Sequence, residues 1–393
     1  MKKSICILLL AASVALVGCS KNPKTPSDSE VTLTPTVAAT ETPTEAPATA
    51  TPAPTNTPTP KPTKAPTTPT PIPTPTTAPT PTPLPEVPYV EFDRSRTYSD
   101  NTMQPLTTNY LYNNSAPEGS VINFTYETKN HLANNDTTYQ KSALVYLPAC
   151  YDANDTETKY NVLYLMHGGG DSPKWFLGGE GKKSKITRML DSMIDSGEIK
   201  PMIVCAVSYY TDYSNDATRN CLNFHYELMN DLIPVLETTY PTYATDVTPD
   251  GLAASRTHRG FGGFSMGAVT TWSVFEHCLN EFAYFVPMSG DCWALGSTAG
   301  SSRSLQTAQH LAAKVAESNK TAEDFFLYTG CGTSDIANPN LTPQVNAMST
   351  LTDTFLYCKN FANGNLYECI VPGGHDVQTV TAILYNAIPK LFH

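Results

Sequence analysis

A serine between two glycines is the first feature of the chain that could do chemistry. Gly263, Ser265 and Gly267 form the pattern Gly-x-Ser-x-Gly, which follows an apolar run at 259–264 and precedes a segment of helical period. At a sharp turn from strand to helix, such glycines allow close backbone packing and leave the serine hydroxyl exposed beyond the strand. The pattern predicts Ser265 as a nucleophile, with the N–H of Met266 directed at a developing oxyanion. The alternative is a glycine-rich turn whose serine has no chemical role.

A serine hydroxyl needs a base, and the chain order expected for this scaffold is serine, then acid, then histidine. His375 lies in the segment from Val371 to Asp376, directly after the last strand-like run, where a base can reach across the strand ends. The other histidines after Ser265 lie in expected helices or at the last position: His277, His310 and His393. We therefore predict His375 as the base, with an exposed loop histidine as the alternative.

The acid that orients this histidine should follow the preceding strand. Asp335 lies on the loop after the run at 325–329, and Asp291 follows the earlier run at 283–288. We favour Asp335, because its strand directly precedes the strand of the histidine. Asp291 is the main rival. The aspartate that does not orient the histidine is expected to cap a loop.

A second oxyanion donor should come from the loop after an early strand. The run at 162–166 leads into His167-Gly168-Gly169-Gly170, a loop of backbone donors, in which Gly169 is the best candidate. His167 precedes the serine and belongs to the framework of this loop. We expect it to pin the loop rather than to transfer protons.

The elements that must position these residues alternate along the chain. Seven short apolar runs read as strands: 143–147, 162–166, 202–207, 259–264, 283–288, 325–329 and 366–371. Six longer segments read as helices: 184–196, 222–240, 266–280, 304–317, 343–357 and 377–391. This alternation predicts an α/β fold with a mostly parallel central sheet and helices on both faces, and its active site at the carboxyl ends of the strands.

The amino-terminal end is typical of an export signal. Two lysines precede an apolar run from Ile5 to Val17, which is too short to span a membrane as a mature helix. The ending Leu16-Val17-Gly18-Cys19 resembles the lipobox of bacterial lipoproteins. We expect a signal peptide over residues 1–18 and a lipid on Cys19, with an ordinary signal peptide as the alternative.

Prolines mark a linker after this signal. Twenty of the 33 prolines lie between Pro23 and Pro88, interleaved with threonine. Such a segment buries too little apolar surface to offset the entropy of ordering it, and ~65 residues of polyproline II could extend on the order of 200 Å. We expect residues 19–88 to form a lipidated terminus and disordered linker, and residues 89–393 to form one large domain.

Charge and cysteine usage exclude other classes of protein. Residues 89–393 carry 19 basic and 31 acidic side chains, a net charge of −12, which would repel nucleic acid. No Cys-x-x-Cys pair or histidine–cysteine cluster has zinc spacing, so we expect no metal. Eight cysteines remain after Cys6 and Cys19. The sequence leaves their disulfide pairing open, although those in apolar runs, such as Cys205, are expected to be buried thiols.

The region from about residue 120 to 393 resembles the feruloyl esterases of carbohydrate esterase family 1, especially those appended to clostridial xylanases. The most specific stretch runs from Ala254 through Ser265 to Trp272. Further similar stretches are 164–170, 197–204, 230–234, 287–291, 335–337 and 338–348, followed by the loop to His375.

This resemblance implies the α/β-hydrolase fold and a serine ester hydrolase without cofactor, which releases ferulic or related hydroxycinnamic acids from arabinoxylan. By position, Trp293 corresponds to an aromatic residue beside the bound phenolic ring, where stacking contributes on the order of 1 kcal/mol; an ordinary core tryptophan is the alternative. Cys292 and Asp376 depart from some relatives and leave the acyl specificity open.

The expected partners are a feruloylated plant cell-wall polysaccharide and, through the lipid, a membrane at the bacterial cell surface. Two other functions remain open at this point. One is an acetyl-xylan or other short-acyl esterase of the same fold. The other is a surface glycan-binding lipoprotein without catalysis.

Overall fold

The computed structural model describes residues 104–106, 108–113, 115–358 and 364–392 of the chain. The expected signal peptide, Cys19, the linker to residue 88 and the first part of the expected domain, to residue 103, lie outside the described residues, as does His393. Within the described ranges, no helix has both the length and the apolar character needed to cross a bilayer.

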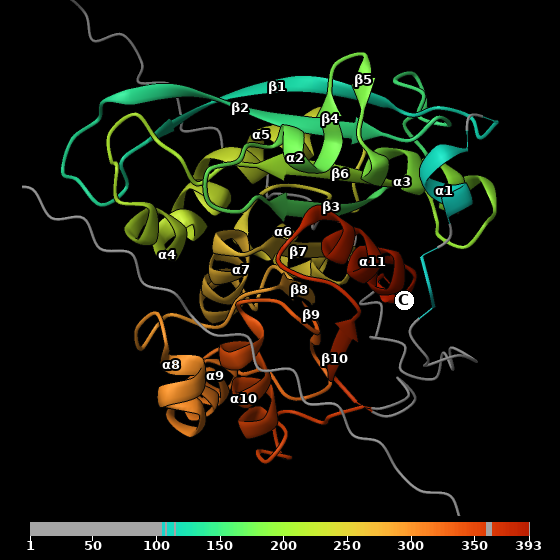
Figure 1. Cartoon of the computed structure of the whole chain (residues 1–393). Coiled ribbons are helices and arrows are strands. Elements are labelled where there is room, and N and C mark those ends of the chain that lie inside the picture. Colours follow the sequence, from blue (N-terminus) through green and yellow to red (C-terminus); the bar gives the residue numbers. More distant parts are fainter. Residues whose placement is uncertain (1–103, 107, 114, 359–363, 393) are drawn as a thin grey trace, which may run out of the picture. The chain divides into compact units, whose positions relative to one another are not determined.

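An eight-stranded sheet runs through the described domain in the order β1-β2-β6-β3-β7-β8-β9-β10 (Figure 1). Its strands are β1 (Ser120–Lys129), β2 (Thr138–Leu147), β3 (Asn161–Met166), β6 (Met202–Val207), β7 (Arg259–Phe264), β8 (Tyr284–Met288), β9 (Phe326–Gly332) and β10 (Leu366–Val371). Strand β2 pairs antiparallel with β1 and β6, and the pairs from β6 to β10 are parallel. This mostly parallel sheet confirms the predicted fold class.

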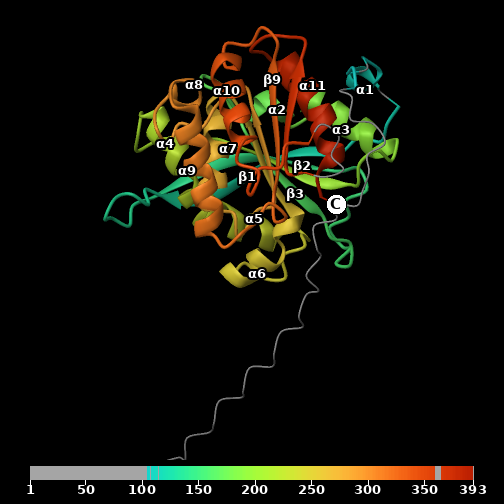
Figure 2. The ribbon, with the colours of Figure 1, turned by 90° about the horizontal axis from the view of Figure 1, so that it is seen from below.

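Helices cover both faces of the sheet (Figure 2). They are α1 (Thr108–Tyr112), α2 (Lys174–Leu177), α3 (Lys185–Asp195), α4 (Ala217–Glu227), α5 (Ile233–Thr239), α6 (Pro249–Ala254), α7 (Met266–His277), α8 (Ala299–Ser302), α9 (Ser304–Glu317), α10 (Asn338–Met348) and α11 (Val377–Ala387). Two hydrophobic cores result, one with side chains from α4, α5, α7, α9 and α10, the other with side chains from α1, α2, α3 and α11. Strands buried from both sides explain the nearly continuous apolar runs in the sequence.

All seven expected strands are present, and the structure adds β1 and the two-residue strands β4 (Gly178–Gly179) and β5 (Lys182–Lys183). Strand β1 was missed because its ten residues alternate between buried and exposed positions, as expected for a strand with one solvated face, instead of forming an apolar run.

Two of the expected helices have different bounds. The helix expected over 343–357 begins earlier, at Asn338, because Pro339 suits its first turn, and Pro343 therefore falls inside it; it ends at Met348. The helix expected over 222–240 begins at Ala217, where the Asp216 side chain accepts a hydrogen bond from the Arg219 N–H. A π-helical turn, Leu228–Leu232, separates α4 from α5 within it.

Candidate active site

Ser265 occupies the sharp turn between β7 and α7. Its φ of 56° and ψ of −114° lie in a region that non-glycine residues rarely adopt, and its N–H is held by the Met288 carbonyl at 2.9 Å. A Cβ placed on Gly263 would lie 2.3 Å from the Gly267 carbonyl oxygen, and one on Gly267 would lie 2.0 Å from the Met166 carbonyl oxygen. Both glycines of the motif are therefore required for this backbone geometry.

Asp335 and His375 form a hydrogen-bonded pair beyond the ends of β9 and β10. The Nδ1 atom of His375 lies 2.7 Å from Oδ1 of Asp335. The Asp335 side chain is fully buried, whereas 22% of the His375 side chain is exposed. Because a carboxylate only accepts, Nδ1 carries the proton, and Nε2 is left to take a proton from a nucleophile.

Hydrogen bonds between two loops bring this pair together. The Thr333 N–H donates to the Val371 carbonyl at 2.9 Å, and the Ser334 N–H donates to the Gly373 carbonyl at 2.8 Å. The Asp376 carboxylate then caps α11 by accepting from the N–H groups of Gln378 and Thr379. Asp376, which departs from some relatives, thus anchors the loop that carries His375.

The Asp335 carboxyl is held in its ionised form. Burial by itself raises its pKa, but the hydrogen bond to His375, the neighbouring Ser289 hydroxyl and the Ala337 N–H at 2.8 Å together bring the pKa below its usual value. Ser289 is buried and has a positive φ of 57° at the end of β8. Sequence reasoning missed this residue, and only its position directly after a strand hinted at a role.

Asp291, the rival acid, has other partners. Its Oδ1 accepts from the Trp293 indole N–H at 3.1 Å, and its Oδ2 accepts from the Gly300 N–H at 3.0 Å. Burial raises its pKa. The structure therefore brings Asp335 to His375, whereas Asp291 fixes the half-buried ring of Trp293 on the loop after β8.

The ring of Phe264 joins the serine turn to the histidine. Its centroid lies 4.5 Å from that of His375, and its other neighbour is Trp175, stacked at 4.8 Å with an interplanar angle of 3°. Among the described residues, no hydrogen bond joins Ser265 to His375. Catalytic hydrogen bonds are commonly longer in ligand-free proteins and shorten when substrate binds.

The loop after β3 lies against the serine turn. A Cβ on Gly168 would lie 3.3 Å from Cβ of Ser265, and one on Gly169 would lie 3.6 Å from Cγ of Met266. Among the residues that the structure describes, the Gly169 N–H has no hydrogen-bond acceptor. The Met266 N–H belongs to the first turn of α7, where amides lack helical acceptors. Two backbone donors without an acceptor in the described residues thus belong to segments that adjoin Ser265.

His167 holds this loop, as the sequence indicated. Its Nδ1–H donates to the Gly168 carbonyl at 2.7 Å, so its Nε2 accepts from the Ser208 hydroxyl at 2.9 Å. Burial lowers the pKa of the ring and keeps it neutral. Two further contacts were missed: the Gly170 N–H donates to the Tyr210 hydroxyl at 2.7 Å, and the Tyr209 hydroxyl donates to the Gly168 carbonyl at 3.4 Å.

Within the described ranges, no group of three or more His, Cys, Asp or Glu side chains is arranged to hold a metal ion. The eight cysteines of this part of the chain form no disulfide, and all except Cys150 are buried.

The fold and this arrangement define a serine ester hydrolase of the α/β-hydrolase class. The model of the Esterase family matches residues 136–390, and the chain belongs to this family. Endo-1,4-beta-xylanase Y of Acetivibrio thermocellus is 37% identical over 292 residues, which are 74% of this chain and 24% of that protein. The chain thus spans about a quarter of the length of this relative.

Solved structures agree with this assignment. The feruloyl esterase module from Clostridium thermocellum, a serine-to-alanine mutant complexed with sinapinate, is 37% identical, with a TM-score of 0.64 over 74% of this chain and 94% of that one. A ferulic acid esterase of carbohydrate esterase family 1 from Anaeromyces mucronatus is 18% identical, with a TM-score of 0.54 over 76% of this chain and 98% of that one, and supports the fold alone. The resemblance to feruloyl esterases is confirmed.

Proposed function

We propose that this chain hydrolyses esters of ferulic and related hydroxycinnamic acids, with Ser265, His375 and Asp335 as its catalytic residues. One observation carries the proposal. The strained turn at Ser265, the Asp335–His375 hydrogen bond and two unengaged backbone donors lie at one edge of the sheet, in a chain 37% identical to a module complexed with sinapinate. Sinapinate is itself a hydroxycinnamate.

The mechanism follows from this geometry. Nε2 of His375 takes the proton of Ser265 while Oγ attacks the ester carbonyl. The N–H groups of Met266 and Gly169 stabilise the oxyanion, and the alcohol leaves with the proton from His375. Water then attacks the acyl-enzyme by the same route, while Asp335 keeps the imidazole in the required tautomer throughout.

Trp293 supplies the aromatic wall for the acyl group in this proposal. Its indole N–H is fixed by Asp291, so the orientation of the ring is set before substrate binds. A planar cinnamoyl group gains from such a wall on the order of 1 kcal/mol beyond burial. Rates of ferulate release from methyl ferulate and of acetate release from acetylated xylan test the assignment. Acetate release without ferulate release would contradict it and indicate a short-acyl esterase.

The amino-terminal features support a proposal about location. We propose that Cys19 carries a lipid and that the proline-rich segment to residue 88 spaces the esterase domain from the bacterial membrane. The supporting evidence is the lipobox-like ending and the twenty prolines. Shortening the linker is expected to reduce ferulate release from intact cell wall and to leave hydrolysis of methyl ferulate unchanged. An equal fall on both substrates would contradict the spacer role.

A further inference from the structure

A narrow crevice lined by polar and aromatic side chains lies at the same edge of the sheet as Ser265. Its walls are the loop after β1, from Asn130 to Leu132, and the segment from Tyr209 to Glu227, which follows β6 and includes α4. Strands β1 and β6 are both antiparallel to β2, and β6, β3 and β7 are parallel. The carboxyl ends of β1, β6 and β7 therefore lie at the same edge of the sheet (Figure 1).

One side chain separates this crevice from the oxyanion loop. Tyr209 lines the crevice, and its hydroxyl both contacts the Gly168 carbonyl at 3.4 Å and lies 4.0 Å from a Cβ built on Gly169. The neighbouring Tyr210 hydroxyl accepts from the Gly170 N–H. The crevice is therefore the neighbour, beyond Tyr209, of a ligand whose ester carbonyl occupies the oxyanion site.

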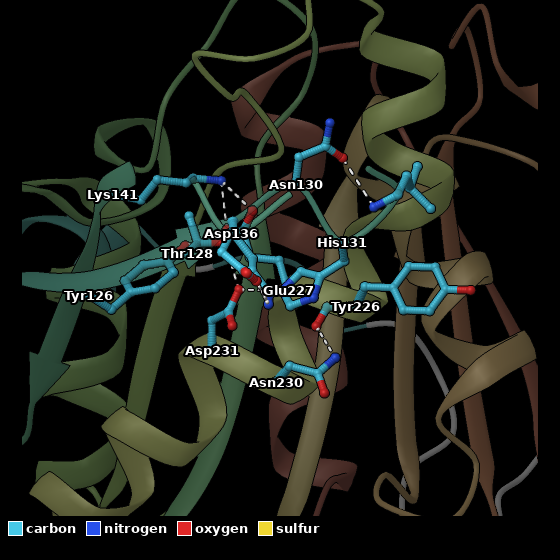
Figure 3. A network of polar contacts seen from close by, with 12 residues as sticks. Tyr126, Thr128, Asn130, His131, Asp136, Lys141, Tyr226, Glu227, Asn230 and Asp231 are labelled. Carbon is cyan, nitrogen blue, oxygen red and sulfur yellow. Dashed lines mark hydrogen bonds and ion pairs between the residues drawn. The ribbon is translucent and has the colours of Figure 1, made fainter. Parts of the chain in front are cut away.

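A network of polar contacts lies beside the crevice and includes two of its lining residues, Glu227 and His131 (Figure 3). The Glu227 carboxylate accepts from Lys141 Nζ at 2.6 and 2.9 Å and from the Tyr126 hydroxyl at 2.6 Å. Beside it, Asp231 lies 2.6 Å from Nε2 of His131 and accepts from the Thr128 hydroxyl at 2.6 Å. This network fixes the β1 loop to α4 and the π-helical turn before any ligand binds, which lowers the entropy that binding must overcome.

The lining presents amide, hydroxyl and phenol groups together with His131, the paired carboxylate of Glu227 and one guanidinium. The Asn223 amide donates to the Arg219 carbonyl at 2.7 Å, and its oxygen accepts no hydrogen bond in the described structure. The Arg219 guanidinium forms no ion pair in the described part of the chain. Tyr226 lies at the rim, with 42% of its surface exposed. Donors, acceptors and an exposed ring suit a polyhydroxylated ligand that offers both kinds of polar group and apolar ring faces.

Size restricts what can enter. The free volume inside the crevice is about 30 Å³. A single water needs at least about 10–15 Å³ by this measure, so the space admits a hydroxyl or hydroxymethyl group and not a whole ring. A sugar ring would therefore rest over the mouth, against Tyr226, with one substituent inserted.

We propose that this crevice binds a sugar residue in the alcohol half of the ester, and that it makes the enzyme prefer oligosaccharide esters over simple alkyl esters. This inference rests on the proposed function. Arg219 and Asn223 contact the hydroxyl groups of the sugar, and neither takes part in hydrolysis itself.

The test compares two substrates, methyl ferulate and a feruloyl-arabinosyl xylo-oligosaccharide, with the full chain. Arg219→Ala and Asn223→Ala are each expected to lower kcat/KM for the oligosaccharide about 3- to 10-fold, the effect of one lost hydrogen bond, mainly through KM. Their kcat/KM for methyl ferulate should stay within about 2-fold of wild type, because that substrate lacks the sugar.

Asn230→Ala is the matched control. Asn230 lies on the same helical segment, and its amide donates to the Tyr226 carbonyl at 2.7 Å, the same i to i−4 bond that Asn223 makes, but it does not line the crevice. Asn230→Ala should leave kcat/KM for both substrates unchanged. Unchanged oligosaccharide kinetics in Arg219→Ala and Asn223→Ala, an equal loss on both substrates, or an equal loss in Asn230→Ala would overturn the proposal. Failure of the wild-type enzyme to hydrolyse methyl ferulate would instead contradict the proposed function.

Discussion

The two ends of β7 are built in opposite ways. At its start, Arg259 is buried and donates to both oxygens of Glu237 at 2.6 and 2.7 Å, to the Leu252 and Glu281 carbonyls, and to the Ser255 hydroxyl. At its end, Ser265 has a strained backbone, and the Met266 N–H lies in the first turn of α7, where it has no helical acceptor. The polar groups at the start of β7 are hydrogen-bonded within the fold, whereas those at its end remain available to bind a substrate.

Residues at the start of this six-residue strand stabilise the fold, and residues at its end serve the reaction. In a buried ion pair, mutual attraction and further hydrogen bonds offset the cost of desolvating both charges, but the loss of one partner leaves an uncompensated charge in the core. Strain and unpaired donors destabilise a fold, and they persist where the surroundings enforce them and a reaction uses them. Substitutions at the carboxyl end should therefore change rates, and substitutions at the amino end should change stability.

The largest expected effect is that of Ser265→Ala. Loss of the nucleophile should lower kcat on methyl ferulate by about 10⁴- to 10⁶-fold, with the free energy of unfolding changed by less than ~1 kcal/mol. Ser265→Gly should be equally inactive and more stable than Ser265→Ala, because glycine accepts a positive φ without strain. Ester-hydrolysis rates and urea denaturation measure both quantities. Near-wild-type turnover in either variant would remove Ser265 from the mechanism.

Asp335→Asn should have the next largest effect. Loss of the carboxylate that orients His375 is expected to reduce kcat about 10⁴-fold, since an asparagine can stabilise the wrong tautomer. Asp291→Asn is the matched control, because it follows the neighbouring strand and is equally buried, and it should cost less than about 10-fold through Trp293. Steady-state kinetics of both variants decide the matter, and the reverse order would transfer the orienting role to Asp291.

Arg259→Met tests the other end of β7. It leaves Glu237 buried without its partner and should destabilise the fold by about 3–5 kcal/mol, with kcat/KM of the folded fraction close to wild type. The double variant Arg259→Met with Glu237→Gln should recover most of that loss, because it removes the unpaired charge. Denaturation curves of the two variants provide the measurement. A large fall in kcat/KM at full folding would show that the two ends are not separable.

The smallest expected effect is a difference in how two aspartates respond to acid. The folded pKa of Asp335 lies below its unfolded value, so its ionised form stabilises the fold above about pH 4, and this contribution is lost as pH falls through the folded pKa. The folded pKa of Asp291 lies above its unfolded value, so falling pH relieves a penalty there.

As pH falls from about 6 to about 3, the free energy of unfolding of wild type minus that of Asp335→Asn should therefore decrease. The corresponding difference between wild type and Asp291→Asn should increase. Thermal unfolding of the three proteins across this range measures both differences. If both stability differences changed equally with pH, the two carboxyl groups would not differ in environment.

The sequence predicted the parts of the molecule whose signals are local. Seven strands were found because each is a short, mostly apolar run, and the Ser265 turn because its two glycines lie within five residues of sequence. The pairing of Asp335 with His375 followed from chain order and strand adjacency.

The parts that were missed depend on contacts between distant segments. Strand β1 is not an apolar run, and its place in the sheet depends on its pairing with β2. The Lys141–Glu227 pair joins residues 86 positions apart. The Ser289 conformation and the cap formed by Asp376 depend on backbone geometry that residue type alone does not indicate. The crevice belongs to this group, because its walls come from two loops that only the fold brings together.

The most direct test of the central claim is the mass of the enzyme quenched during turnover of 4-nitrophenyl ferulate. We predict a covalent adduct of one feruloyl group per chain, located by peptide mapping on the peptide that contains Ser265 and absent from Ser265→Ala. Ferulate release without an adduct, or an adduct on another residue, would contradict an acyl-enzyme formed at the carboxyl end of β7.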